Sequence, residues 1–347
     1  MRFGAPAARL AAVLLLIAPA AFAQTVISAT ARGVLVAQSG SLQVFDRAGR
    51  NVVWSTASVP TPTAITASNN HAAVIDAFDN EVRLIDLDAK QAMTITTGET
   101  PVDGTFINGA LYLLERDARA LERIGTDGAR ASIDVAADPA FLREANGTLY
   151  VYSRLDGVLQ VITASPFAIR RSVRVPPFAS DLEVDARNAY LAYPRAANIG
   201  VVSLATMASA GKIDVGAVPV DVAFASSGSA LTARTLAVAD PSGKRVWLIE
   251  GAQSMSQAIT RGFLRGLLGL GLFGGNGSQF PTGVDRVITR GSRWYAYDSS
   301  SGTLYRFTKN KSTAIAKGIA PTEFSAGPGG VFVWDEAVRR LQRIEAE

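Results

Sequence analysis

The chain lacks cysteine altogether and has a single histidine, His71, among its 347 residues. Without cysteine there can be no disulfide framework, cysteine-ligated zinc or iron–sulfur site, covalently attached c-type haem or thiol nucleophile. One histidine can serve only once in a catalytic triad or a metal site, so multi-histidine metal sites are excluded as well. Hydrophobic residues make up 48% of the chain, which is enough for a large core.

The N-terminus has the pattern of a secretory signal. Arg2 and Arg9 supply positive charge, residues 10–18 are apolar, and Ala21-Phe22-Ala23 is a small-residue cleavage site. We therefore expect a signal peptide over residues 1–23, cleaved after Ala23, and export to a bacterial periplasm or the extracellular side. Without the two arginines the formal net charge falls from +4 to +2. Nucleic-acid binding needs a strongly basic face, so a nucleic-acid partner is not expected.

Proline recurs along the chain with a period of about 40 residues. The spacing is 38 to 42 residues, apart from 62 residues between Pro219 and Pro281. The full set is Pro62, Pro101, Pro139, Pro177, Pro219, Pro281 and Pro321. Each unit holds an apolar strand, a polar turn and an alternating strand, as in 72–86 (AAVIDAFDNEVRLID), which predicts a β-hairpin. Apolar stretches before and after each hairpin bring the unit to about four strands.

Four short strands repeated at this period are typical of a β-propeller. Segments 149–163 (LYVYSRLDGVLQVIT) and 236–249 (LAVADPSGKRVWLI) resemble the NHL and YVTN-type propeller repeats, and the resemblance extends over nearly all of the mature chain. We expect an all-β fold, a β-propeller of about eight four-stranded blades with a short last blade, in one domain over residues 24–347. Seven blades are the alternative, if a strand near Val26 completes the last blade.

The 62-residue gap contains a hydrophobic Gly/Leu-rich insertion, expected at 261–280 after a fourth strand near 254–260. Large apolar residues this dense in a loop usually mark a contact. They either form a short helix over the mouth of the channel or dock on another envelope protein or a membrane surface. The candidate partner-binding residues are Arg261, Phe263, Leu264, Arg265, Leu267, Leu268, Leu270, Leu272 and Phe273.

An acidic residue ends the second strand in five units, and an aromatic residue precedes this position in several. The acidic residues are Asp76, Glu115, Asp240, Asp298 and Asp335, and we interpret them as turn caps rather than a ring of Ca²⁺ ligands. The aromatic residues are Tyr152, Tyr193, Tyr297 and Trp334, and we interpret them as packing between blades. Trp54, Trp247 and Trp294 have the same interpretation, and His71 is expected to be an ordinary loop residue.

No nucleophile–base pair, metal cluster or cofactor motif stands out, so we name no catalytic, metal or cofactor residue and expect no cofactor. This favours a non-enzymatic scaffold or binding protein of the bacterial cell envelope, with another envelope protein as its partner. The nearest analogy is a periplasmic propeller that assists envelope assembly. The alternative is a metal-dependent, lactonase-like propeller hydrolase with its site at the channel mouth. Its candidate ligands, at the ends of the inner strands, are Asp103, Asp181, Asp221 and Asp285.

Overall fold

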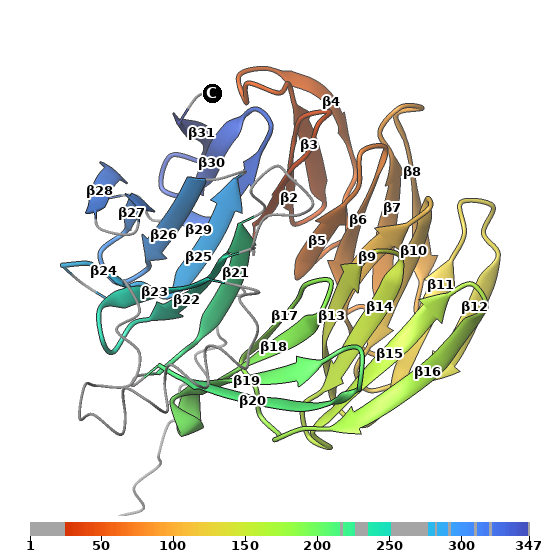
Figure 1. The fold of residues 1–347 in the computed structure, drawn as a ribbon. Helices are drawn as coiled ribbons and strands as arrows, with labels where there is room; N and C mark the ends of the chain where they lie inside the picture. Colours follow the sequence, from red (N-terminus) through yellow and green to blue (C-terminus); the bar gives the residue numbers. More distant parts are fainter. Residues whose placement is uncertain are drawn as a thin grey trace, which may run out of the picture.

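The computed structural model describes residues 25–215, 218–225, 235–250, 277–281, 283–290, 293–308, 311–318 and 321–345. Within these residues 31 strands form eight antiparallel sheets, the blades, which stand side by side around a ring (Figure 1). Seven blades have four strands and the last has three. We call the strands of a blade a to d in chain order, with strand a innermost.

The first four blades follow one another without interruption. Blade 1 comprises β1 (Val26–Ala29), β2 (Val34–Gln38), β3 (Ser41–Phe45) and β4 (Val52–Thr56). Blade 2 comprises β5 (Ala64–Ala67), β6 (His71–Asp76), β7 (Glu81–Asp86) and β8 (Gln91–Thr96). Blade 3 comprises β9 (Pro101–Ile107), β10 (Ala110–Glu115), β11 (Ala120–Ile124) and β12 (Arg130–Asp134). Blade 4 comprises β13 (Pro139–Ala145), β14 (Thr148–Ser153), β15 (Val158–Ala164) and β16 (Phe167–Arg174).

The remaining blades include a short 3-10 helix and the three-stranded sheet. Blade 5 comprises β17 (Asp181–Val184), β18 (Asn188–Tyr193), η1 (Pro194–Ala196), β19 (Asn198–Ser203) and β20 (Ala208–Asp214). Blade 6 comprises β21 (Asp221–Ala225), β22 (Thr235–Asp240), β23 (Arg245–Glu250) and β24 (Gly277–Gln279). Blade 7 comprises β25 (Arg286–Arg290), β26 (Arg293–Asp298), β27 (Thr303–Thr308) and β28 (Lys311–Ala316). Blade 8 comprises β29 (Pro321–Gly327), β30 (Gly330–Asp335) and β31 (Arg340–Glu345).

The ring is closed by its inner strands. Each strand a contacts strand a of the next blade, and β29 of blade 8 contacts β1 of blade 1. Because β1 pairs with β2 in its own sheet, the first strand does not complete the last blade. The prediction of eight blades with a short last one is confirmed, and the seven-blade alternative is wrong.

The two ends of the ring carry different connections. Turns between strands b and c, and connections from strand d to the next strand a, lie at one end, which we call the b–c face. Turns between strands a and b, and between c and d, lie at the other end, the a–b face. This division decides which side chains share a surface.

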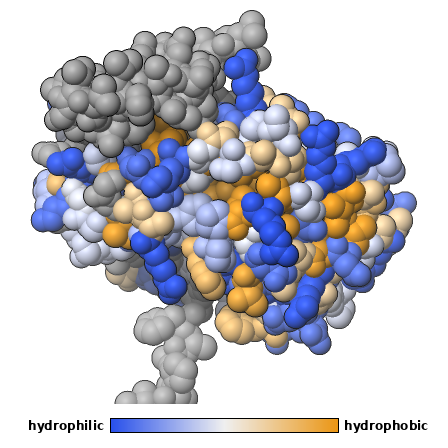
Figure 2. All heavy atoms as spheres, turned by 60° about the horizontal axis from the view of Figure 1, so that its bottom comes forward, coloured by the Kyte–Doolittle hydropathy of each residue, from blue (hydrophilic) through white to orange (hydrophobic). Residues whose placement is uncertain are grey.

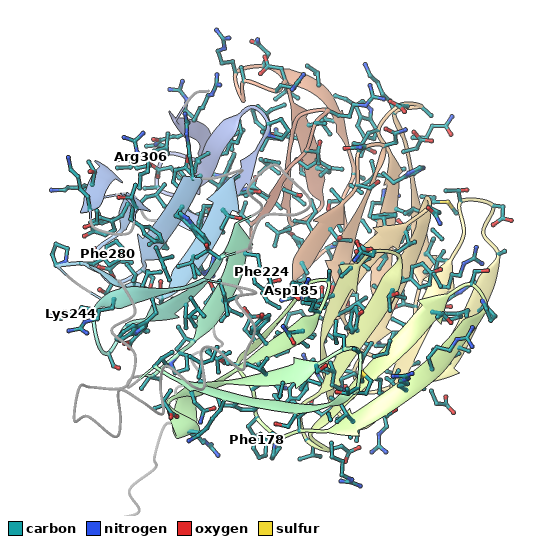
Figure 3. All side chains as sticks on the ribbon, viewed as in Figure 1. Phe178, Asp185, Phe224, Lys244, Phe280 and Arg306 are labelled. Carbon is teal, nitrogen blue, oxygen red and sulfur yellow. The ribbon has the colours of Figure 1, made fainter. Side chains whose placement is uncertain are left out.

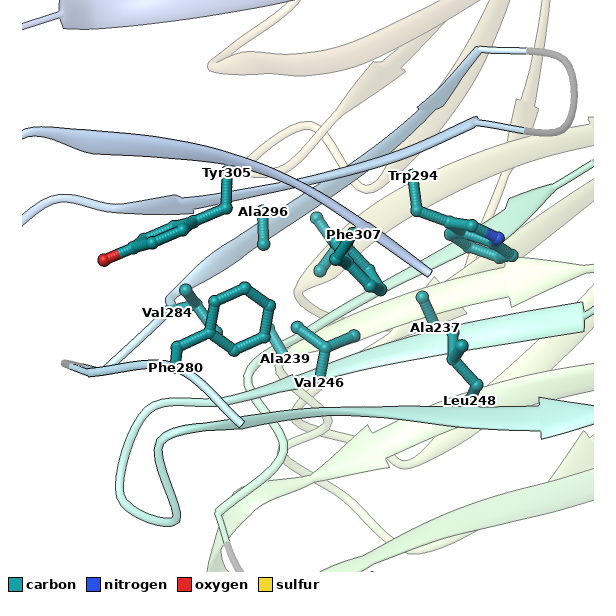
Figure 4. Close-up of a cluster of buried hydrophobic side chains, with 11 residues drawn as sticks. Ala237, Ala239, Val246, Leu248, Phe280, Val284, Trp294, Ala296, Tyr305 and Phe307 are labelled. Carbon is teal, nitrogen blue, oxygen red and sulfur yellow. The ribbon is translucent and has the colours of Figure 1, made fainter. Parts of the chain in front are cut away.

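The core lies between the blades. All six residues of β10 are buried, because strand b is covered on both faces by neighbouring blades, whereas the outermost strand β12 is mainly exposed. The cluster between blades 6 and 7 is an example (Figure 4). There the Phe280 ring meets the rings of Tyr305 and Phe307 edge-on, with centroids 5.0 and 5.6 Å apart. No helix in the described part of the chain is long and apolar enough to span a membrane.

Blade 6 differs from the expected arrangement. Its fourth strand is β24 at Gly277–Gln279, which pairs with β23, and not the segment near 254–260, which lies outside the described residues. Phe280, expected at the end of the insertion, is buried in the core. The extra residues therefore join strands c and d. Since β23 ends opposite the start of β22, the chain leaves blade 6 at the a–b face, not at the b–c face.

Candidate functional site

Three carboxylates at the mouth of the channel join neighbouring blades. Asp103, Asp181 and Asp221 share one register, because each lies opposite the second-to-last residue of its strand b. Each accepts a hydrogen bond from the backbone of strand a in the next blade. The bonds are Leu142 N to Asp103 Oδ2 (2.9 Å), Val222 N to Asp181 Oδ2 (3.0 Å) and Val287 N to Asp221 Oδ2 (2.7 Å). Each carboxylate therefore links its blade to the next one by a hydrogen bond. We call these three carboxylates latches and their shared register the latch position.

The fourth candidate of this group, Asp285, has another place. It precedes β25, and Arg286 takes the register of the other three by pairing with Tyr297. The carboxylate of Asp285 accepts hydrogen bonds from the backbone N–H and the hydroxyl of Ser299 in the following b–c turn. A cavity of about 310 Å³ at this point is lined by Asp221, Asp285 and Arg286, among others.

Arg143, which the sequence did not single out, connects two of the latches. Its Nη1 is 3.1 Å from Asp103 Oδ2 and its Nη2 is 2.9 Å from Asp181 Oδ1. Phe141, over whose ring the guanidinium lies at 5.8 Å, holds the latch position in blade 4. Arg143 follows two residues later and so lies on the same side of the strand. The guanidinium supplies the positive charge between carboxylates that the hydrolase alternative assigns to a metal ion.

Burial controls the protonation of this group. It raises the pKa of Asp103, although the positive charge of Arg143 acts in the opposite direction. Burial, followed by the neighbouring charge of Asp181, raises the pKa of Asp221 well above its ordinary value. Among the described residues, no three His, Cys, Asp or Glu side chains form a group that could hold a metal ion. The arrangement holds neighbouring blades together and raises the pKa of two of its carboxyl groups.

Four of the five acidic residues at the end of strand b are turn caps, as predicted, whereas Glu115 binds the connection that enters its blade. Asp76 Oδ1 accepts hydrogen bonds from Phe78 N and Asp79 N, and its Oδ2 accepts one from Thr61 N at 2.6 Å. Asp240, Asp298 and Asp335 likewise accept backbone N–H groups of their own turns, and Glu115 accepts the N–H of Gly98 at 2.7 Å. Their lone pairs are used within the blade connections.

The aromatic residues pack between blades, as predicted. Tyr152, Tyr193, Tyr297 and Trp334 are buried in inter-blade clusters, and Trp54, Trp247 and Trp294 belong to such clusters too. His71 is the first residue of β6, at the a–b face, and stacks on Phe106 with ring centroids 6.0 Å apart. The candidate partner-binding residues between Arg261 and Phe273 lie outside the described residues.

The b–c face displays apolar side chains that the sequence did not single out. Phe78, Leu155 and Val338, in the b–c turns of blades 2, 4 and 8, are 73%, 59% and 63% exposed. Phe178 and Val218, in connections from strand d to the next strand a, are also exposed. Figure 2, in which the lower edge of Figure 1 is turned forward, shows hydrophobic residues grouped among hydrophilic ones on that side of the molecule. A repeat alignment signals these positions, because each interrupts an otherwise polar turn.

No family model and no curated protein matches this chain. Solved structures do match it. BamB from Moraxella catarrhalis has a TM-score of 0.64 and 11% identity over 91% of this chain and 94% of that one. The computationally designed Ika8 protein has a TM-score of 0.69 and 11% identity, covering 92% and 95%. Virginiamycin B lyase from Staphylococcus aureus has a TM-score of 0.57 and 14% identity, covering 78% and 90%. At such identities the similarity concerns the fold, and the chain is a β-propeller repeat protein.

Proposed function

We propose that the protein is an exported, non-enzymatic β-propeller of the bacterial cell envelope that binds another protein through its b–c face. The observation that carries the proposal is the exposure of Phe78, Leu155 and Val338 at the tips of b–c turns. Burial of exposed apolar side chains against a partner is favourable, because it removes their surface from water. Each lies in a β-hairpin turn, and the three hairpins belong to different blades. One partner can therefore contact several blades at once.

The channel residues support a binding role over a catalytic one. Asp103 and Asp181 are occupied by backbone N–H groups and by Arg143, so their lone pairs serve the fold. A virginiamycin B lyase from Staphylococcus aureus is catalytically inactive when one histidine is replaced by alanine. The single histidine of this chain, His71, instead stacks on Phe106 at the a–b face. A lyase-type use of histidine at the channel mouth therefore has no support here.

The hydrophobic segment supplies a second proposed contact. Residues 263–273 hold seven large apolar side chains, with Arg261 before them and Arg265 among them. Because this segment joins β23 to β24, the proposal assigns it a contact separate from the b–c face. The proposed export rests on the signal pattern of residues 1–23.

Site-specific photo-crosslinking in intact bacteria tests the proposal. A photoreactive amino acid is placed at Leu155 or Val338, and at the exposed Asn69 of the a–b face as the control. We expect one discrete protein adduct from the first two sites and none from Asn69. The proposal is wrong if the folded protein gives no adduct from the b–c face, or the same adduct from all three sites.

A deletion of residues 263–273 tests the second contact. It leaves β24 and Phe280 intact, so blade 6 keeps its outer strand and core. We expect a photoreactive amino acid at Leu268 of the full-length protein to give a protein adduct, and the adducts at Leu155 and Val338 to persist in the deletion variant. Loss of flotation with anionic vesicles, without loss of any protein adduct, would assign the segment to a membrane surface instead.

A further inference from the structure

A cavity of about 410 Å³ opens on the b–c face between blades 4 and 5. Its floor is apolar and includes Leu191 and Val202, and its walls include Tyr193, Pro177 and Phe178. Cationic side chains stand at its edge. This size and composition match the pockets in which proteins hold small molecules, which have volumes of about 300–1,000 Å³.

The cavity exists because one repeat position has lost its side chain. The third residue of strand c is large in seven blades and is glycine only in blade 5, at Gly200. The seven others are Gln43, Arg83, Glu122, Gln160, Trp247, Tyr305 and Gln342. A Cβ at Gly200 would lie 2.7 Å from Cε2 of Tyr193, so the glycine admits the tyrosine ring and leaves open space beyond it.

The residue that faces Gly200 from the connection entering blade 5 also differs from its counterpart in blade 4. In blade 4, Gln160 Oε1 accepts a hydrogen bond at 2.9 Å from the N–H of Ala136, in the connection that enters the blade. The corresponding residue of blade 5 is Pro176, which has no N–H. The hydrogen bond between strand c and the entering connection that fills this space in blade 4 therefore has neither its acceptor nor its donor in blade 5.

Phe178 forms an aromatic wall at a backbone position that does not favour it. Its φ of 64° is left-handed, and the corresponding residues of the two preceding connections are Asp138 (55°) and Thr100 (56°). Asp suits this conformation, whereas a bulky side chain seldom adopts it. The ring is nevertheless 49% exposed, with the Arg195 guanidinium 5.5 Å from its centroid (Figure 3 labels Phe178 at the lower edge of the molecule). Folding alone gives little reason for a phenylalanine here.

The edge of the cavity carries unneutralised positive charge. Within the described part of the chain neither Arg174 nor Arg195 forms an ion pair, whereas Lys212 pairs with Asp214 at 3.0 Å. Guanidinium groups bind carboxylates through two parallel hydrogen bonds. An apolar, aromatic-walled cavity beside the guanidinium groups of Arg174 and Arg195 is complementary to a ring that carries a carboxylate.

We infer that this cavity is a binding site for a small aromatic carboxylate. The ring of the ligand lies between Phe178 and the Tyr193 ring that covers Gly200, and the carboxylate meets Arg174 and Arg195. The Leu155 turn borders this site, because Phe178 N donates to Arg154 O at 3.1 Å. None of Phe78, Leu155 and Val338 lines the cavity, so the inference does not depend on the proposed protein partner.

Amide-resolved NMR titration with 3-phenylpropionate tests the inference, with neutral 3-phenylpropanamide as the matched probe. We expect shifts confined to the backbone around 174–178, 193–202 and 209–212. The carboxylate should bind about tenfold more tightly than the amide, because only it can form charge-assisted hydrogen bonds. Equal affinities, or shifts elsewhere on the ring, would overturn the inference. So would binding of a peptide that ends in phenylalanine without binding of the free acid.

Variants of the cavity and matched control variants distinguish binding in the cavity from a general effect of lost positive charge. The Arg174→Gln/Arg195→Gln double variant should bind 3-phenylpropionate about tenfold more weakly. The Arg47→Gln/Arg50→Gln double variant, on blade 1, should bind it normally. Gly200→Gln alone would clash with Tyr193, so it is combined with Tyr193→Ser, which reproduces the Ser153/Gln160 pair of blade 4. This double variant lacks the Tyr193 wall and carries a polar side chain at position 200, so it should melt cooperatively and bind no probe. Unchanged binding would contradict the assignment.

Discussion

At the scale of single residues, one residue type has two structural roles that depend on its position. At the end of strand b, aspartate caps its own turn, as Asp76 does with N–H groups two and three residues later. At the start of strand a, aspartate reaches the next blade, as Asp181 does with Val222. The first role is local and can be predicted from a repeat position. The second depends on ring geometry, and the sequence alone left Asp181 open as a metal ligand.

Two buried tyrosines of one inter-blade cluster provide a matched comparison. Tyr152 Oη donates to Pro176 O and accepts from Ala179 N, whereas Tyr193 Oη finds no partner among the described residues. We expect Tyr152→Phe to lower the free energy of unfolding by about 1–3 kcal/mol, because it leaves buried backbone groups unpaired. Tyr193→Phe should be neutral, or stabilising by up to about 1 kcal/mol. Equal losses in urea unfolding would contradict this difference.

Glu115 gives stability a measurable pH dependence. Burial, against the hydrogen bond from the Gly98 N–H, raises the pKa of Glu115 from 4.5 to about 7, and the charge of Glu122 contributes to the rise. The folded state therefore binds this proton more tightly than the unfolded state does. Its contribution to stability grows as the pH falls from above 7 towards 4.5, and is lost as the pH rises again.

The Glu115→Gln variant removes this titration and keeps an acceptor for Gly98. We expect its melting temperature to exceed that of the parent by about 2 °C at pH 8, and the difference to vanish once the pH falls below 4.5. Exposed Glu99→Gln makes the same charge change and should show no such trend. A pH-independent difference for Glu115→Gln would mean that the proton is not the cause.

At the scale of elements, the b–c turns share one backbone feature. In all eight described b–c turns, the residue before strand c has a positive φ, and only three of these residues are glycine. The set is Gly40, Asn80, Arg119, Gly157, Ala197, Lys244, Gly302 and Arg339. A left-handed residue at the end of the turn returns the chain antiparallel and sets the register of the b–c pair. The non-glycine members hold this geometry at a conformational cost.

Ala197, with a φ of 52°, is a direct test of that cost. Ala197→Gly should stabilise the protein by about 0.5–1 kcal/mol, because glycine accepts this conformation more readily than alanine does. Its neighbour Ala196 lies in η1, and Ala196→Gly should destabilise by about 0.5–1 kcal/mol. Urea unfolding of both proteins checks the opposite signs. Two changes of the same sign would show that the turn is not set by this residue.

The elements that the sequence predicts well are those with strong local patterns. The b–c hairpins alternate apolar and polar residues around a polar turn, and they form as expected. β24 was missed because it is three residues of Gly-Ser-Gln without alternation, and it forms by pairing with β23 across a long connection. Arg143 and the cavity at Gly200 depend on contacts between blades. The glycine was nevertheless visible as the exception at a repeat position.

At the scale of the whole molecule, the ring closes through packing and side-chain hydrogen bonds, without a shared sheet. Blade 1 is built entirely from N-terminal strands and blade 8 from C-terminal ones, so no sheet joins the two ends. The interface packs Ile27 and Val34 against Phe332 and Trp334. A series of hydrogen bonds lies beside it. Trp334 Nε1 and Thr25 Oγ1 both donate to Glu336 Oε2, and Gln38 Nε2 donates to Thr25 Oγ1. We therefore expect the ring to open first at this interface.

Gly329 gives a specific way to loosen that interface. It lies in the a–b turn of blade 8, where a Cβ would come 1.7 Å from Arg47 O, a backbone atom of blade 1 that no rotamer change can move. Gly329→Ala should therefore destabilise the protein by about 1–3 kcal/mol and reduce hydrogen-exchange protection first in β1 and β29. Gly147→Ala is the control, since it changes the a–b turn of blade 4, where nothing lies within 4 Å. It carries only the cost of its positive φ of 74° and should leave β1 protected. If β1 amides stay protected in Gly329→Ala while the protein loses stability, ring opening does not begin at the contact between the first and last blades.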